Sequence, residues 1–210
     1  MRPHLHTTRC LHPTRWAVLS ILSLVVLLQA CRSSPRHPSG QQGGSTGAAL
    51  SGLTKTDVRF MQEMIVHHAQ ALAMTDLVAD RTDSEALQKL ARRIEVSQKD
   101  EIAMMERWLD ASGESAPERH HHDPLMPGML TEEELVRLAA ATGDEFDRLF
   151  LEYMIRHHEG ALVMVADLFS GGGGQEAEVF RIASNVDADQ RAEIARMRGM
   201  LTTPSQEGNE

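Results

Sequence analysis

A pattern of fifteen residues that occurs twice, ninety residues apart, constrains the fold of this chain more than any other feature. Residues 60–74 read FMQEMIVHHAQALAM and residues 150–164 read FLEYMIRHHEGALVM. The apolar matches are those of a duplicated hydrophobic core. A core does not require the adjacent histidines and the two methionines that both copies also share, so these residues predict a duplicated binding site.

The similarity between the two copies extends beyond this pattern. Asp57 precedes the first copy as Asp147 precedes the second. Two polar residues recur downstream at an offset of ninety-two: Gln98 as Gln190, and Glu101 as Glu193. The two additional residues fit in the glycine loop 171–174, where we expect a hinge. The repeated unit is therefore a helical hairpin.

Apolar residues spaced by three and four predict helices through almost all of the folded part. The first helix is expected to start at Thr54 or Thr56. The second opens at Thr82, whose hydroxyl can cap the helix while Glu85 bonds back, and it ends at Gly113. A short helix follows at 131–143, and two long helices are expected at 144–169 and 175–201.

Two similar antiparallel hairpins associate most simply as a four-helix bundle. We therefore predict an all-α fold, a four-helix bundle made of two repeated helical hairpins plus a short extra helix. The metal-binding domain covers residues 54–201, and residues 202–210 form a disordered tail. Facing helices of such a bundle bring their inward side chains to one axis.

The amino terminus predicts export. Three arginines and no acid precede a short apolar run at 16–28, and Leu-Gln-Ala leads into Cys31. The run is shorter than the roughly 20 residues of a membrane span, and a cysteine at this place is typical of a bacterial lipoprotein signal. We predict a signal peptide at 1–30, lipid attachment at Cys31 and a flexible tether at 31–53. An uncleaved anchor is the alternative, and either arrangement holds the domain outside the cytoplasm on the cell membrane of a bacterium.

Loss of the leader changes the cysteine and charge inventory. Cys10 leaves with it and Cys31 is consumed by the lipid, so the mature chain has no disulfide and no thiolate ligand. The formal net charge moves from −9 to −12, because the leader contains three arginines and no acid. An acidic domain with few aromatic residues lacks the basic stripe that nucleic-acid binding needs, and it suits metal cations as partners.

Methionine sulfur and imidazole nitrogen are the soft ligands that remain. Met64 lies one helical turn from His67 and His68, so these side chains come within about 5–6 Å of each other at Cβ. Met74 lies about 10 Å beyond His67 along the helix, so it either serves another position or shares an ion across helices. Thioether and imidazole without thiolate suit Cu(I), with Ag(I) as its mimic, although methionine at helical spacing also fills cores. The predicted metal ligands are Met64, His67, His68, Met74, Met154, His157, His158 and Met164.

The doubled Met-Ile-x-His-His motif, with a further methionine six residues after each pair, resembles the signature of the ferritin-like "domain of unknown function three-zero-five" family. The copper-binding members of that family include the CopM type. The resemblance covers residues 53–201. It implies a ferritin-like four-helix bundle, exported or membrane-tethered, that binds copper and in some members silver through methionine and histidine.

A di-iron oxidase or ferroxidase is the main alternative, because ferritin-like bundles often carry Glu-x-x-His pairs. The spacing here differs, since Glu63 precedes His67 by four residues and Glu152 precedes His157 by five. The repeated aspartates Asp57 and Asp147 suit helix starts. The repeated polar residues either orient the ligand histidines or satisfy each other; these are Gln98, Glu101, Gln190 and Glu193.

A second group of soft ligands lies between the hairpins. His120, His121 and His122 are followed by Met126 and Met129, and this loop either captures copper at the surface or is simply solvated.

The expected function is a non-enzymatic copper-binding lipoprotein that sequesters or passes on Cu(I) and confers copper resistance, with a copper transporter or chaperone as partner. Iron is the cofactor of the di-iron alternative. A third reading is an envelope bundle that binds a partner and uses its histidines structurally; no oligomeric state follows from the sequence.

Overall fold

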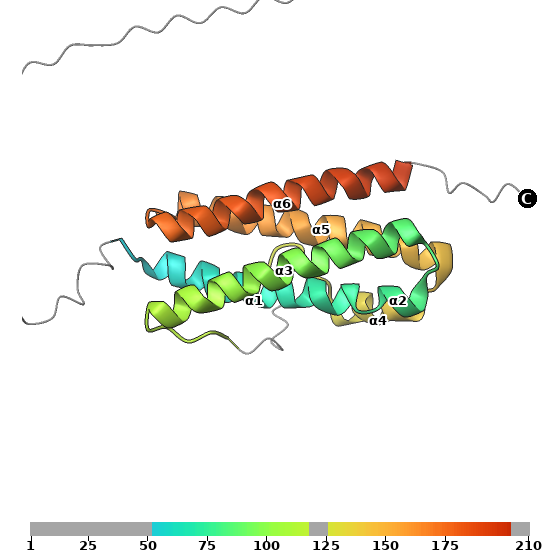
Figure 1. Ribbon diagram of the computed structural model, residues 1–210, viewed down its shortest axis with the longest axis horizontal. Coiled ribbons are helices and arrows are strands. Elements are labelled where there is room, and N and C mark those ends of the chain that lie inside the picture. Colours follow the sequence, from blue (N-terminus) through green and yellow to red (C-terminus); the bar gives the residue numbers. More distant parts are fainter. Residues whose placement is uncertain (1–51, 118–125, 203–210) are drawn as a thin grey trace, which may run out of the picture. The chain divides into compact units, whose positions relative to one another are not determined.

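A computed structural model describes residues 52–117 and 126–202, and their secondary structure is entirely helical (Figure 1). The helices are α1 (Lys55–Thr75), α2 (Val78–Arg81), α3 (Glu85–Ala111), α4 (Glu132–Ala140), α5 (Gly143–Ser170) and α6 (Ala177–Thr202). The prediction of an all-α bundle of two hairpins with a short extra helix is confirmed. The signal peptide, Cys31, the tether up to residue 51, His120–His122 and the tail from residue 203 lie outside the described residues.

Two of the predicted helix starts are formed by reciprocal side-chain caps. The Thr54 hydroxyl accepts the Asp57 N–H at 3.1 Å, and the Asp57 carboxylate accepts the Thr54 N–H at 2.8 Å. Thr131 and Glu134 make the same pair of hydrogen bonds at the start of α4. Each pair satisfies amide groups that the first helical turn leaves without a partner.

The predicted start of the second long helix was wrong by two residues. Ser84 caps α3, and its hydroxyl accepts the Leu87 N–H at 3.3 Å. Thr82 instead follows the one-turn helix α2, and its hydroxyl accepts the Ser84 N–H at 3.0 Å. Threonine and serine are both good caps, so the turn between α2 and α3 decides which one is used.

Helices α1 and α5 cross in antiparallel directions at the centre of the bundle (Figure 1). Near the start of α1, Phe60 belongs to the same core cluster as Leu168 near the end of α5. Near the end of α1, Met74 belongs to a second cluster with Phe150 from the first half of α5. The buried core therefore consists of two apolar clusters, and the His-His pairs lie in the middle of both helices between them.

Each hairpin holds the turn of the other hairpin. Asp57, near the start of α1, accepts the Gly174 N–H in the turn between α5 and α6 at 2.6 Å. Asp147, near the start of α5, lies beside Thr82 and Ser84 in the turn before α3, and these side chains oppose the rise in its pKa that burial causes. Both repeated aspartates therefore have structural partners at the ends of the bundle.

The glycine loop that we expected to be a hinge is a tightly packed turn. Gly174 adopts a φ of +71°, and a Cβ atom there would lie 2.4 Å from the Phe169 ring. Any other residue at this place would be strained in its backbone and would collide with that ring. Its amide also carries the hydrogen bond to Asp57, so the turn is fixed to α1.

The chain between the hairpins crosses α1 and α5 in a segment of five residues, 126–130, which we call the crossing segment. The Gln70 side chain binds it by two hydrogen bonds to the Leu130 backbone, at 2.7 and 3.0 Å. On α5, a Cβ atom at Gly160 would lie 1.9 Å from the Pro127 carbonyl oxygen. Gln70 and Gly160 occupy equivalent positions in the two copies, so the crossing segment makes the two halves of the bundle different.

Candidate metal centre

The four histidines of the two motifs form one buried cluster. Each is at most 1% exposed. The rings of His67 and His157 stack across α1 and α5, with centroids 3.9 Å apart. Each ring lies 6.4 or 6.2 Å from that of its neighbour in sequence, His68 or His158. The structure therefore brings together at one centre the histidines that the sequence places in two separate motifs.

The outer two histidines are each bound by a buried carboxylate. The Nε2 atom of His68 lies 2.6 Å from Glu101, and that of His158 lies 2.7 Å from Glu193. A carboxylate accepts, so Nε2 carries the hydrogen in the neutral imidazole and Nδ1 keeps the lone pair. Neither Nδ1 atom has a hydrogen-bond partner.

The inner two histidines are held differently. His67 Nε2 donates to the Pro127 carbonyl oxygen at 2.9 Å, so its Nδ1 also keeps a lone pair without a partner. Neither ring nitrogen of His157 makes a hydrogen bond. Burial, assisted by the neighbouring histidines, lowers the pKa of His67 to about 3 and that of His157 well below its usual value. Both rings are therefore neutral imidazoles at pH 7, the form that binds metal ions.

Further polar atoms around the histidines lack partners. Both side-chain atoms of Gln98, and one side-chain oxygen each of Glu101 and Gln190, are buried without a hydrogen bond. Gln98 and Glu101 thus do not satisfy each other, which was one of the two roles expected for them. An unmade hydrogen bond of a buried group costs about 1–3 kcal/mol, so a dense group of such atoms in a core requires an explanation.

The predicted methionine ligands lie on both sides of the histidine cluster. Met64 shares one core cluster with Met164, and Met74 shares the other with Met154. All four are at most 6% exposed. Because α1 and α5 are antiparallel, each core cluster contains one of these methionines from each helix, and Met74 shares its cluster with Met154 rather than with Met64.

Carboxylates and histidines alone do not form a site in this arrangement. Within residues 52–117 and 126–202, no three histidine, cysteine, aspartate or glutamate side chains are placed to hold one metal ion. The crossing segment contributes the Pro127 carbonyl, which the sequence analysis missed. The sequence does contain a sign of this segment: its two contact positions, Gln70 and Gly160, differ although the two copies are otherwise similar.

The two methionines of the crossing segment have different environments. Met129 is 8% exposed and belongs to the buried core. Met126 is partly buried and lines a pocket between α1 and α5 together with Met164. The two methionines that we predicted within one weaker group therefore lie in different environments.

The sequence profile of the family described as "Domain of unknown function (DUF305)" matches residues 57–201. A DUF305 fragment from Deinococcus radiodurans is 33% identical, with a TM-score of 0.65 over 71% of this chain and 97% of that chain. A DUF305 protein from Streptomyces coelicolor that is inferred to be secreted is 31% identical, with a TM-score of 0.63 over 74% and 98%. Cu(I)-bound CopM is 28% identical, with a TM-score of 0.57 over 70% and 96%.

CopM has also been solved with Cu(II) and with Ag bound. Among curated proteins, none matches the chain. The profile covers well over half of the sequence and includes both Met-Ile-x-His-His motifs. The chain therefore belongs to the DUF305 family.

Proposed function

We propose that this protein is an extracytoplasmic, non-enzymatic copper-binding protein that sequesters or passes on Cu(I), with Ag(I) as a substitute ion. The metal is held by the buried histidine cluster and by the methionines on either side of it. The proposed ligands are Met64, His67, His68, Met74, Met154, His157, His158 and Met164.

One observation carries this proposal. Three buried imidazoles have Nε2 within hydrogen-bond distance of a carboxylate or a carbonyl oxygen, and the Nδ1 atom of each has no partner. Histidines that bind metals usually donate their other N–H to such a group, which fixes the tautomer and the ring orientation. Glu101, Glu193 and the Pro127 carbonyl would play this orienting role.

The chemistry of the available atoms supports a soft ion. Thioether and imidazole without thiolate favour Cu(I) over ions that prefer oxygen ligands. CopM, at 27–28% identity, has been crystallised with Cu(I), Cu(II) and Ag, so metals of this kind bind a protein of the same fold. Cu(I) is our choice because neutral imidazole and thioether match its softness.

The location rests on the leader-like sequence and on one relative. Residues 1–30 have the pattern of a lipoprotein signal that ends at Cys31, and the Streptomyces coelicolor relative is inferred to be secreted. Among the described helices, none combines the length and apolar character that crossing a membrane requires. We propose attachment through a lipid at Cys31, with a copper transporter or chaperone as partner.

The test is an anaerobic titration of the full-length protein, purified in detergent without a histidine tag, against a chromophoric Cu(I) chelator. Cu(I) and Ag(I) should bind more tightly than Fe(II). Because the four imidazoles form one cluster, replacing either pair by Gln should remove more than half of the tight binding. The two pairs are His67 with His68 and His157 with His158.

Methionine is tested by a double change, Met64→Leu with Met154→Leu, which should weaken Cu(I) binding and leave the helical content unchanged because the two side chains are similar in volume. Met104→Leu, at a partly buried position of α3 outside the proposed ligands, is the control. If a variant in which all four of these histidines are replaced still binds the full amount of Cu(I), the proposal is contradicted. Binding of Fe(II) with oxygen consumption would favour a di-iron oxidase, for which the two buried His–Glu pairs are the supporting observation.

A further inference from the structure

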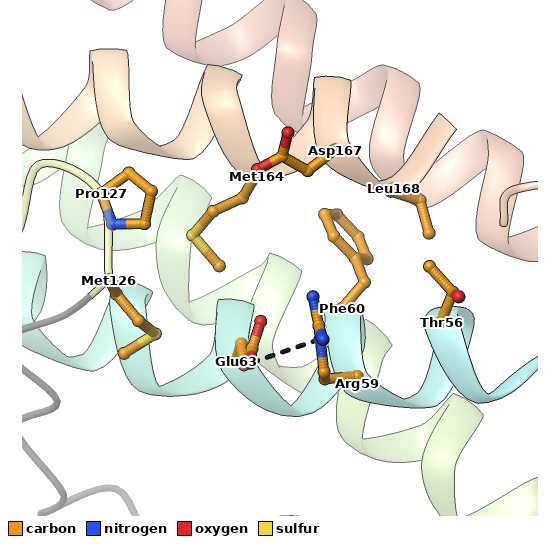
Figure 2. A pocket seen from close by; sticks show the side chains of 9 residues that line it. All are labelled: Thr56, Arg59, Phe60, Glu63, Met126, Pro127, Met164, Asp167 and Leu168. Carbon is orange, nitrogen blue, oxygen red and sulfur yellow. Dashed lines mark ion pairs between the residues drawn. The ribbon is translucent and has the colours of Figure 1, made fainter. Parts of the chain in front are cut away.

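The two ends of the histidine cluster are not equivalent. Beside the cluster end that contains Met64 and Met164, a cavity of about 320 Å³ opens between α1 and α5, next to the crossing segment (Figure 2). Three charged side chains from α1 and α5 line it, namely Arg59, Glu63 and Asp167. The cavity is therefore polar and in contact with solvent.

The equivalent positions at the other end are apolar. Arg59, Glu63 and Asp167 correspond in the repeat to Leu149, Tyr153 and Leu77. Leu149 is buried, and Tyr153 and Leu77 pack against the same core cluster. Leu138 of α4 belongs to that cluster and is completely buried. Between α1 and α5, one end of the duplicated site is thus filled by apolar packing, whereas the other end has an opening. A further cavity of about 670 Å³ lies between α3 and α6, where Leu90 and Glu193 line it.

The open pocket contains two thioethers from different parts of the chain. Met126 comes from the crossing segment and Met164 from α5, and Figure 2 shows both side chains at the end of the pocket where Pro127 lies. Two sulfur ligands with a carboxylate nearby suit a soft cation. Glu63 is available for this role, because its ion pair with Arg59 at 3.5 Å joins two exposed side chains and such pairs contribute little.

Pro127 connects this pocket with the histidines. Pro127 lines the pocket, and its carbonyl oxygen accepts the N–H of the completely buried His67. Met126 is the neighbour of Pro127 in the chain, and Met164 belongs both to the pocket and to the core cluster of Met64. A cation bound by the two pocket thioethers would therefore lie next to the histidine cluster before it enters that cluster.

We propose that this pocket is a separate binding site for a soft monovalent metal cation and the way by which that cation reaches the buried histidines. Met126 and Met164 bind the ion first, assisted by the Glu63 carboxylate. The ion then moves to the histidine cluster, and the opposite end of the bundle takes no part. This inference rests on the proposed function, because the same ion occupies both sites.

Ag(I) titration of the full-length protein with ¹³C-methyl-labelled methionine tests the proposal, since Ag(I) is diamagnetic. The Met126 and Met164 methyl signals should shift at the first additions, before the histidine ring signals change. Removing a group that only orients a metal ligand lowers affinity about 10–100-fold, so Met126→Leu should weaken the early binding by at least about tenfold. It should also slow the loading of the histidines.

Two control variants separate a local effect from a general loss of methionine. Met104→Leu changes a partly buried methionine of α3, and Met74→Leu changes the repeat equivalent of Met164 at the end filled by apolar packing. Neither should slow the loading of the histidines, although Met74→Leu should weaken the final binding. Equal slowing by Met74→Leu and Met126→Leu would overturn the inference.

The outcomes also distinguish this inference from the proposed function. If the histidine signals respond to Ag(I) at an unchanged rate in Met126→Leu, and the Met126 methyl never shifts, the pocket is not the way in while metal binding stands. If no methionine or histidine signal responds to Ag(I) in the unmodified protein, the proposed function itself fails and the pocket site fails with it.

Discussion

Replacement of Gly160 by Ala should destabilise the protein, although the same change in an ordinary helix stabilises it. Alanine in a helix interior is favoured over glycine by about 1 kcal/mol. At Gly160, however, the new Cβ would lie 1.9 Å from the Pro127 carbonyl oxygen, 2.4 Å from the Pro127 carbonyl carbon and 2.8 Å from the Gly128 Cα. All three are backbone atoms, so no side-chain rotation relieves the collision.

The size of the effect follows from what must move. Ordinary contact begins at 3.4 Å, so the crossing segment has to retreat by about 1.5 Å. That shift breaks the hydrogen bond from His67 to Pro127, and an unsatisfied buried N–H costs about 1–3 kcal/mol. Overpacking adds about 1–3 kcal/mol. After subtraction of the helix preference, we expect a net loss of roughly 1–5 kcal/mol in the free energy of unfolding.

Urea unfolding followed by circular dichroism measures this loss against a matched control. Gly199 lies in α6, and a Cβ atom there meets nothing within 4 Å. Gly199→Ala should therefore leave stability unchanged or raise it by up to about 1 kcal/mol. If Gly160→Ala stabilises the protein as much as Gly199→Ala does, the crossing segment does not pack on α5 as described, and the reasoning is refuted.

Two further predictions concern the dependence of stability on pH and the attachment of the protein to the membrane. The metal-free protein should lose stability as the pH falls below about 6.5, because histidine in the unfolded chain takes up a proton near 6.5 whereas folded His67 does so only at about 3. The free energy of unfolding should fall by up to about 1.4 kcal/mol per pH unit for this residue, and a His67→Gln variant with an equally steep slope between pH 6.5 and 4 would contradict the assignment. Cys31→Ser should release the protein from the membrane fraction or leave its precursor uncleaved, because the lipid provides about 0.8 kcal/mol per buried CH₂; normal maturation and membrane retention would argue against a lipid at Cys31.

The helices were predictable because local rules determine them. Spacing by three and four placed the long helices, and the structure has reciprocal caps at two of the expected starts, Thr54 for α1 and Thr131 for the short helix α4. The start of α3 was misplaced because Thr82 and Ser84 are both good caps. Asp147 of the other hairpin lies beside both side chains, and sequence spacing within one hairpin carries no information about that neighbour.

The repeat identified the histidines and the glutamates beside them, but not how they are held. Glu101 binds His68, which agrees with the first of its two expected roles, the orientation of a ligand histidine. The Pro127 carbonyl at His67 depends on the path of a segment that carries no repeat. The pairing of Met74 with Met154 depends on the antiparallel crossing of α1 and α5, which becomes visible only when the two hairpins are packed together.

The exchanged contacts at the ends of the bundle have a consequence for its ancestry. Asp57 accepts a hydrogen bond from the turn of the second hairpin and Asp147 lies beside the turn of the first, so each hairpin contacts the turn of the other. Two copies of one hairpin could form the same bundle as a symmetric dimer, with all four histidines near the twofold axis. A dimer made from one gene must carry identical residues at both equivalent positions. Gln70 on one side and Gly160 on the other could therefore arise only after the sequence that encodes one hairpin had been duplicated.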